Sequence, residues 1–83
     1  MIYNVLLSRN ALRDLDNLDG TLQRRITSKL REFSDDPLKY ARKLTSPKIG
    51  TYRFRIGDYR VIFDIDGDNL IVLRIGHRKK IYE

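Results

Sequence analysis

The first part of the chain contains a short apolar run followed by apolar residues at helical spacing. Residues 2–7, IYNVLL, are apolar and β-favouring, and Ser8 follows as a candidate helix N-cap. From Arg9 onward, apolar residues recur at helical intervals as far as Leu18-Asp19-Gly20. A first helix is expected to stop at this point and a second to begin after it.

The second helix is predicted by a single apolar stripe. Leu22, Ile26, Leu30 and Phe33 lie four, four and three residues apart, and Pro37 ends the pattern. Residues 38–50 have no clear period and are expected to form a loop. Two antiparallel helices joined by a short turn are therefore predicted.

The period then changes to two, which predicts a β-hairpin. Apolar and polar residues alternate from 52 to 65 on either side of Gly57-Asp58, which suits a two-residue turn. One face of this hairpin is apolar and consists of Tyr52, Phe54, Ile56, Tyr59, Val61, Phe63 and Ile65. A second turn at 66–69 and a strand at 70–75 complete a meander. The predicted fold is α+β, with the order β-α-α-β-β-β and a two-helix hairpin on a small antiparallel sheet.

Three arginines gather on the other face of the predicted hairpin. A turn at Gly57-Asp58 places Arg55 directly opposite Arg60, and Arg53 lies on the same side. Like charges opposite each other destabilise a sheet, so a small protein would tend to avoid this pair. Guanidinium groups bind phosphate oxygens bidentately and can stabilise a pentacoordinate transition state, which favours an anion site. The competing interpretation is that acidic neighbours, namely Asp58, Asp64 or Asp66, neutralise the arginines.

The side on which Arg74 lies depends on the second turn. With a two- or four-residue turn, Arg74 would point to the apolar face. A three-residue loop or a β-bulge would return it to the side of the arginines, and the bulge is the favoured prediction.

The composition limits the chemistry. The 83 residues are expected to form one domain, 1–83. The chain has no cysteine and one histidine, so neither a metal centre nor a cofactor is expected. No segment approaches the roughly 20 apolar residues that span a bilayer, so a cytoplasmic protein without a membrane partner is expected.

The charge indicates a polyanionic partner. The formal net charge is +6 and the sequence pI is ≈ 9.9. No acidic residue occurs between Asp36 and Asp58, and this interval contains Lys43 and Lys48.

The C-terminal stretch IGHRKKIYE supplies a second group of candidates. His77 can exchange protons near neutral pH, Arg78 can bind phosphate, and Tyr82 can stack on an unpaired base or donate a proton. Lys79 and Lys80 are basic as well, although such residues often form a solvated tail.

With these motifs the chain resembles the RelE/ParE family of toxins from prokaryotic toxin–antitoxin pairs. The resemblance covers the helical hairpin, ARKL before the sheet, YRFRIGDYRVIFDI and the terminal IGHRKKIY. It implies a RelE-like fold. For the RelE branch it also implies a metal-independent endoribonuclease, an mRNA interferase, which is similar in its reaction to microbial ribonucleases. Such a toxin cuts mRNA in the ribosomal A site by attack of the ribose 2′-OH on the adjacent phosphate and so inhibits translation.

The resemblance extends to individual positions. Arg60 matches the phosphate-binding arginine of the sheet motif, Arg78 the arginine after the Gly-basic pair, and Tyr82 the C-terminal aromatic that stacks on RNA. The spacing between Arg78 and Tyr82 is two residues shorter than in the best-known member. Arg53 and Arg55 match two basic residues, the second of which is often a lysine proposed as general base.

An arginine at position 55 departs from that pattern, because arginine stays protonated and is a poor base. Either His77 acts as the base, or the site works by electrostatic stabilisation with weak base assistance. The predicted catalytic set is Arg55, Arg60, His77, Arg78 and Tyr82. The predicted RNA-binding set is Lys43, Lys48, Arg53, Arg74, Lys79 and Lys80.

Two other functions remain open. A ParE-like inhibitor of DNA gyrase shares the fold without a nuclease site, and a non-enzymatic nucleic-acid-binding protein would explain the charge alone. The expected partners of a RelE-type toxin are the ribosome, mRNA and a cognate RelB-like antitoxin that covers or displaces the active site. Such an antitoxin should be acidic and amphipathic, with apolar anchors in a groove of the toxin and carboxylates on its arginines.

Overall fold

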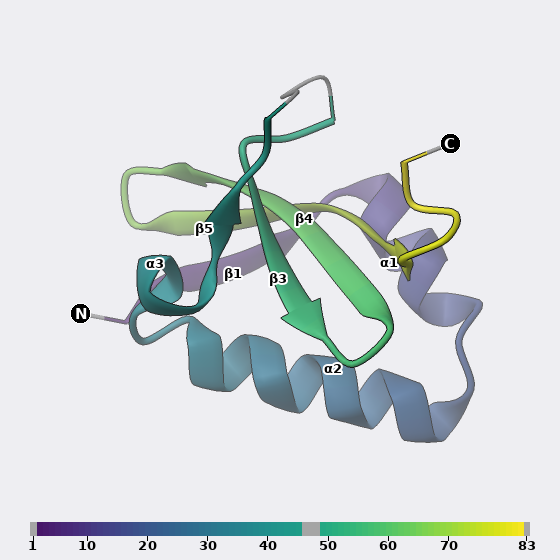
Figure 1. The fold of residues 1–83 in the computed structure, drawn as a ribbon. Coiled ribbons are helices and arrows are strands. Elements are labelled where there is room, and N and C mark those ends of the chain that lie inside the picture. Colours follow the sequence, from purple (N-terminus) through teal and green to yellow (C-terminus); the bar gives the residue numbers. More distant parts are fainter. Residues whose placement is uncertain (1, 46–48, 83) are drawn as a thin grey trace.

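The computed structural model describes residues 2–45 and 49–82, in which helices pack on a five-stranded sheet (Figure 1). The strands lie in the order β1-β5-β4-β3-β2. In chain order the elements are β1 (Asn4–Leu7), α1 (Arg9–Asp16), α2 (Gly20–Phe33), α3 (Pro37–Tyr40), β2 (Arg42–Lys43), β3 (Tyr52–Ile56), β4 (Tyr59–Asp66) and β5 (Asn69–His77).

Side-chain caps start the two longer helices. The Oγ atom of Ser8 accepts the Ala11 N–H (3.1 Å) at α1, and the Asp19 carboxylate accepts the Leu22 N–H (2.9 Å) at α2. The predicted helix start at Ser8 and the restart after Leu18 are both confirmed.

The hairpin between β3 and β4 has the predicted register. Ile56 pairs with Tyr59, Arg55 with Arg60, and Arg53 with Ile62. The predicted apolar face packs under α2, whose stripe contributes Ile26, Leu30 and Phe33 to the core. The Phe54 and Phe63 rings stack at 4.2 Å between centroids within the hairpin, and the Phe33 ring of α2 lies 4.9 Å from that of Phe54, so the apolar face of the hairpin packs against the helix (Figure 1).

A β-bulge in β5 decides the position of Arg74. Gly67 and Asp68 form a two-residue turn, since Asp66 pairs with Asn69. Farther along, Phe63 pairs with Val72 but Ile62 pairs with Arg74, so Leu73 is the extra residue. The predicted bulge is confirmed: Arg74 shares the face of Ile62, while Val72 and Ile75 both enter the core.

Two parts of the structure differ from the sequence prediction. The sheet is antiparallel from β2 to β5, but β1 pairs with β5 in parallel. Residues 38–50 are not all loop, because the short helix α3 and the short strand β2 lie in or beside this range. Pro37 at the first turn of α3 and the stacking of Tyr40 on Phe33 (4.5 Å) stabilise that helix. In the described part of the chain, no helix has both the length and the apolar character needed to cross a bilayer.

Candidate active site

Arg60 lies at the centre of the basic residues on the face of the hairpin opposite α2, here called the arginine face (Arg53, Arg55 and Arg60). Only 6% of Arg60 is exposed. Its Nη1 atom donates to the backbone carbonyls of Gly57 (2.9 Å) and Tyr59 (3.0 Å), which anchors the guanidinium at the hairpin turn. Because the strand pairing fixes Arg55 opposite it, the like-charge pair predicted from the sequence is present.

The arginine face carries positive charge that its neighbours do not neutralise. Burial, and then the charges of Arg55 and Arg53, lower the pKa of Arg60 below its ordinary value. None of the three arginines forms an ion pair with a carboxylate of a described residue. Of the three acidic neighbours considered as alternatives, Asp64 accepts the Thr51 N–H (2.7 Å) and Asp58 pairs with Arg78. Asp66 pairs with Asn69 at the end of β4 away from Arg60. An anion is the ligand that would complete such a site.

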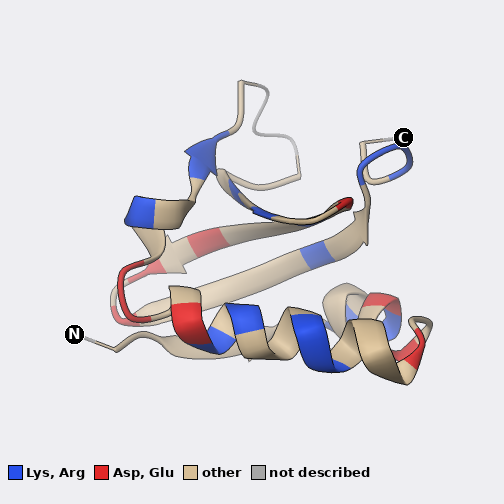
Figure 2. Ribbon diagram, turned by 60° about the horizontal axis from the view of Figure 1, so that its bottom comes forward, with Lys and Arg blue, Asp and Glu red and all other residues tan. Residues whose placement is uncertain are grey.

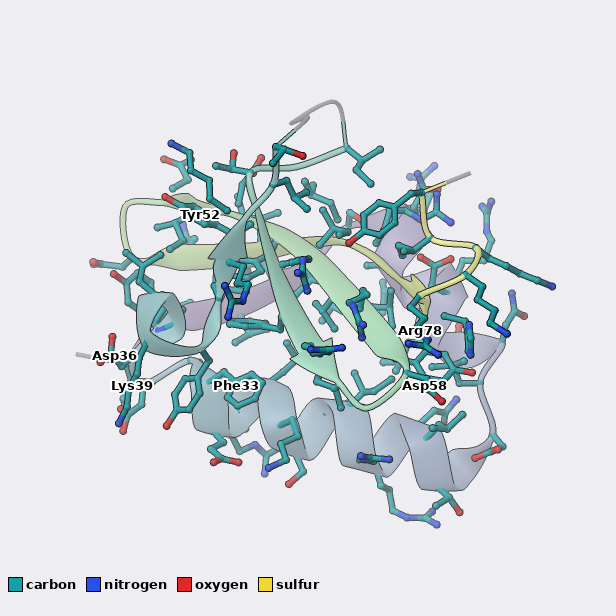
Figure 3. All side chains as sticks on the ribbon, viewed as in Figure 1. Phe33, Asp36, Lys39, Tyr52, Asp58 and Arg78 are labelled. Carbon is teal, nitrogen blue, oxygen red and sulfur yellow. The ribbon has the colours of Figure 1, made fainter. Side chains whose placement is uncertain are left out.

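The residues after β5 fold back as a turn, residues 78–82, which is called the C-terminal turn. The Arg78 N–H donates to the Asp58 carbonyl (2.8 Å), and Arg78 Nε lies 3.7 Å from the Asp58 carboxylate (Figure 3). Ile81 is buried over Gly76, where a Cβ atom would lie 2.9 Å from the Ile81 side chain. Gly76 therefore lets the turn close next to Arg60, its partner across the strands.

This closure brings Arg78 and Tyr82 to the arginine face. Both act on the pKa of Arg60, Arg78 by lowering it and Tyr82 by raising it. Tyr82 is 52% exposed and lines an open pocket of ≈ 400 Å³ together with Lys43, Leu44, Thr45 and Arg53. An aromatic wall beside two cations suits an unpaired base and its phosphate.

Arg42 extends the same basic surface and was not in the predicted site. It lies on β2 directly opposite Arg53, which makes a second like-charge pair (Figure 2). Its position in the acid-free interval after Asp36 was the available signal, but a strand of two residues has too few positions to show a period.

Other predicted residues lie apart from Arg60. His77 pairs with Tyr59, the residue before Arg60 on β4, and so belongs to the opposite face of the sheet. Arg74 binds Asp14 of α1 (Nε to Oδ2, 2.8 Å), and this hydrogen bond raises the pKa of Arg74. Lys79 and Lys80 are exposed and line a second pocket with His77. Lys48 lies outside the described residues.

The clustered arginines could promote a reaction at a phosphate by stabilising its negative charge. Guanidinium groups converging on one phosphate stabilise the charge that develops as a fifth oxygen attacks. Within residues 2–45 and 49–82, no group of three or more His, Cys, Asp or Glu side chains is placed to hold a metal ion.

A small α+β fold with a basic, partly buried arginine cluster is the arrangement that the sequence predicted for a RelE-like toxin. The family model described as ParE toxin of type II toxin-antitoxin system, parDE, matches residues 5–82. Toxin RelE3 of Methanocaldococcus jannaschii is 32% identical over 95% of this chain and 94% of its own length. Toxin RelG of Mycobacterium tuberculosis is 34% identical over 99% of this chain and 98% of its own length.

Solved structures agree with these relatives. The toxin-antitoxin complex RelBE2 from Mycobacterium tuberculosis superposes with a TM-score of 0.84 at 28% identity, over 94% of this chain and 100% of the matched chain. The chain belongs to the RelE/ParE family of toxins of type II toxin–antitoxin systems. It is a toxin of the RelBE type, as the resemblance in its sequence implied.

Proposed function

We propose that the chain is a ribosome-dependent mRNA endonuclease that acts in the cytoplasm and needs no metal ion. The observation that carries the proposal is Arg60, a nearly buried cation surrounded by Arg53, Arg55 and Arg78 without a carboxylate partner among the described residues. The similarity to toxins of the RelE branch supports it.

The proposed reaction is an internal transfer at one phosphate. The ribose 2′-oxygen attacks the adjacent phosphorus, a P–O2′ bond forms, and the P–O5′ bond breaks. A 2′,3′-cyclic phosphate and a free 5′-hydroxyl result, so the 2′-OH loses a proton and the leaving 5′-oxygen gains one. Arg60 and Arg78 would hold the non-bridging oxygens, and Arg55 would add positive charge as the transition state forms. Tyr82 would stack on the base beside the cut.

Of the two explanations for the missing lysine base, the position of His77 supports the electrostatic one. Its ring contacts Tyr59 on the helix side of the sheet, whereas Arg60 lies on the other side. Without a base among the converging arginines, the protein alone should cut naked RNA poorly. The ribosome would then supply the alignment that makes the 2′-oxygen react.

The test is primer extension on a defined mRNA in a reconstituted translation reaction. Cuts confined to the A-site codon are expected, with little cleavage of the same mRNA without ribosomes. Cuts at unrelated positions, or no cuts, would contradict the proposal.

Inhibition of DNA gyrase is the second candidate, because the matching family model is described as ParE toxin. A gyrase inhibitor has no need for a phosphate-binding face, which makes this candidate the weaker one. Loss of supercoiling activity in a gyrase assay, together with intact mRNA on ribosomes, would put it first.

We also propose that an acidic antitoxin binds in the groove between β1 and α2. The groove is lined by Ile2, Tyr3, Val5, Leu7, Thr27, Leu30, Arg31 and Ser34. Its apolar side chains can bind the apolar residues of an amphipathic segment, and Arg31 can form an ion pair with a carboxylate of an acidic one. The similarity to a solved toxin-antitoxin complex supports such a partner.

The substitution Ile2→Asp tests this groove, since Ile2 is 73% exposed in the structure and its change should leave the fold intact. Affinity for the cognate antitoxin should fall about tenfold or more, because an apolar anchor is replaced by a repelling charge. Cleavage on ribosomes should stay unchanged. Equal antitoxin affinity, measured by titration, would exclude this groove as the binding site.

A further inference from the structure

His77 holds the C-terminal turn together through three hydrogen bonds. Its ring Nδ1 accepts the Lys79 N–H at 3.2 Å. Its backbone carbonyl accepts the N–H groups of Lys80 and Ile81, both at 2.9 Å. The side-chain bond has the spacing of an Asx-turn, in which a side chain accepts the N–H two residues later.

The ring of His77 is itself fixed. It meets the Tyr59 ring edge-on, with 5.6 Å between centroids and 81° between planes. Tyr59 packs against the hydrophobic core, so the contact ties the start of the turn to the sheet. Since Nδ1 is an acceptor, neutral His77 carries its proton on Nε2.

The C-terminal turn carries two residues of the proposed active site, Arg78 and Tyr82. Arg78 directly follows His77, and Tyr82 follows Ile81, whose side chain closes over Gly76. Both Arg78 and Tyr82 are close enough to Arg60 to act on its pKa. A change in the turn would therefore move two functional side chains at once.

We propose that His77 is a positioning residue, which acts through its Nδ1 acceptor to hold Arg78 and Tyr82 beside Arg60. It transfers no proton to or from RNA. This role rests on the proposed ribonuclease function. It also explains why His77 precedes Arg78 in sequence although its ring lies on the face of the sheet opposite Arg60.

Three substitutions separate the acceptor from the ring. His77→Asn keeps an acceptor at nearly the same place without the ring, because asparagine forms the same turn. His77→Phe keeps a ring against Tyr59 without the acceptor. His77→Gln moves the acceptor one bond farther from the backbone. Thermal unfolding of each variant shows that the fold is retained.

The cleavage rates of the variants should depend on whether each one keeps the hydrogen-bond acceptor at position 77. His77→Asn should cut A-site mRNA within about twofold of the parent, whereas His77→Phe and His77→Gln should be at least about fivefold slower, the ratio for one ordinary hydrogen bond. Equal activity in all variants, or a His77→Asn variant as slow as His77→Phe, would overturn the proposal.

Backbone amide exchange tests the same role without any cleavage. The Lys79 amide should exchange about fivefold faster in His77→Phe and stay protected in His77→Asn. Unchanged exchange in His77→Phe would overturn the positioning role. If the parent does not cut mRNA on ribosomes, the ribonuclease proposal fails, while the exchange result still decides whether His77 holds the turn.

Discussion

Arg60 is a residue whose position should lower stability and which the proposed function requires. The strand pairing fixes Arg55 opposite it, and the burial of Arg60 leaves little water around its guanidinium to screen the repulsion. Two backbone carbonyls hold the guanidinium in place. The guanidinium is therefore held in a fixed position, as the proposed anion site requires.

Replacing Arg55 with glutamine should separate the effect of the arginine pair on stability from its effect on cleavage. Arg55→Gln removes a like charge opposite Arg60, so the free energy of unfolding should rise by about 0.5 kcal/mol. Cleavage on ribosomes should slow, since one positive charge is lost at the phosphate. Urea unfolding and single-turnover cleavage measure the two quantities.

Arg24→Gln on the exposed surface of α2 is the matched control and should change neither. A variant of Arg55 that is less stable than the parent would show that the arginine pair is not under repulsion.

The hairpin between β3 and β4 was predictable from sequence for a physical reason. Alternation fixes which face is buried, and a two-residue turn fixes which residues pair, so a shift by one residue would bury Arg53 and Arg55. The bulge that places Arg74 was predicted from the same logic, because an arginine does not belong in the core.

Short or distant elements were not predictable in this way. The four residues of α3 and the two of β2 are too few for a period. The parallel pairing of β1 with β5 joins segments more than 60 residues apart, so no local turn sets its direction. His77 illustrates the same limit. Its place beside Arg78 in sequence suggested that it lies on the arginine face, but its pairing with Tyr59 places it on the opposite face of the sheet.

The two hairpin turns provide a matched pair of glycine substitutions. Gly57 and Gly67 both have φ of +59°, which disfavours any side chain. Gly67→Ala should lower the free energy of unfolding by about 1 kcal/mol with normal cleavage, since nothing lies within 4 Å of the added Cβ.

Gly57→Ala should be destabilised at least as much as Gly67→Ala, and it should also cut mRNA more slowly than the parent. Its Cβ would lie 3.0 Å from the Arg25 guanidinium, and its carbonyl holds Arg60. Equal cleavage rates in the two alanine variants would show that the turn does not position Arg60.

At the scale of the whole molecule, the charge is divided between two kinds of basic residue. Arg74 and Arg78 have carboxylate partners, whereas Arg53, Arg55 and Arg60 have none among the described residues, and Arg42 adds to them at the sheet edge. Figure 2 shows how the basic and acidic residues are distributed over the fold. In the proposed function, the net charge of +6 attracts RNA from a distance, and the arginine face holds the phosphate together with Arg78.

An anion should therefore stabilise the folded protein. Phosphate should raise the unfolding temperature by about 4 °C above that in chloride at the same ionic strength, because it binds only the folded state. The rise should be smaller in Arg55→Gln. The unfolding temperature is measured by thermal unfolding in each salt. Equal unfolding temperatures in chloride and phosphate would indicate that the anions only screen the charges and bind no specific site.

Single-turnover cleavage of mRNA on programmed ribosomes by the parent, Arg60→Lys and Arg60→Ala tests the central claim most directly. Both variants should lose about 100-fold or more in rate while remaining folded, since lysine keeps the charge but not the bidentate fork. Cuts should stay confined to the A-site codon in the parent. Folded Arg60 variants that cut mRNA at the parental rate would contradict the claim that the arginine face is the active site.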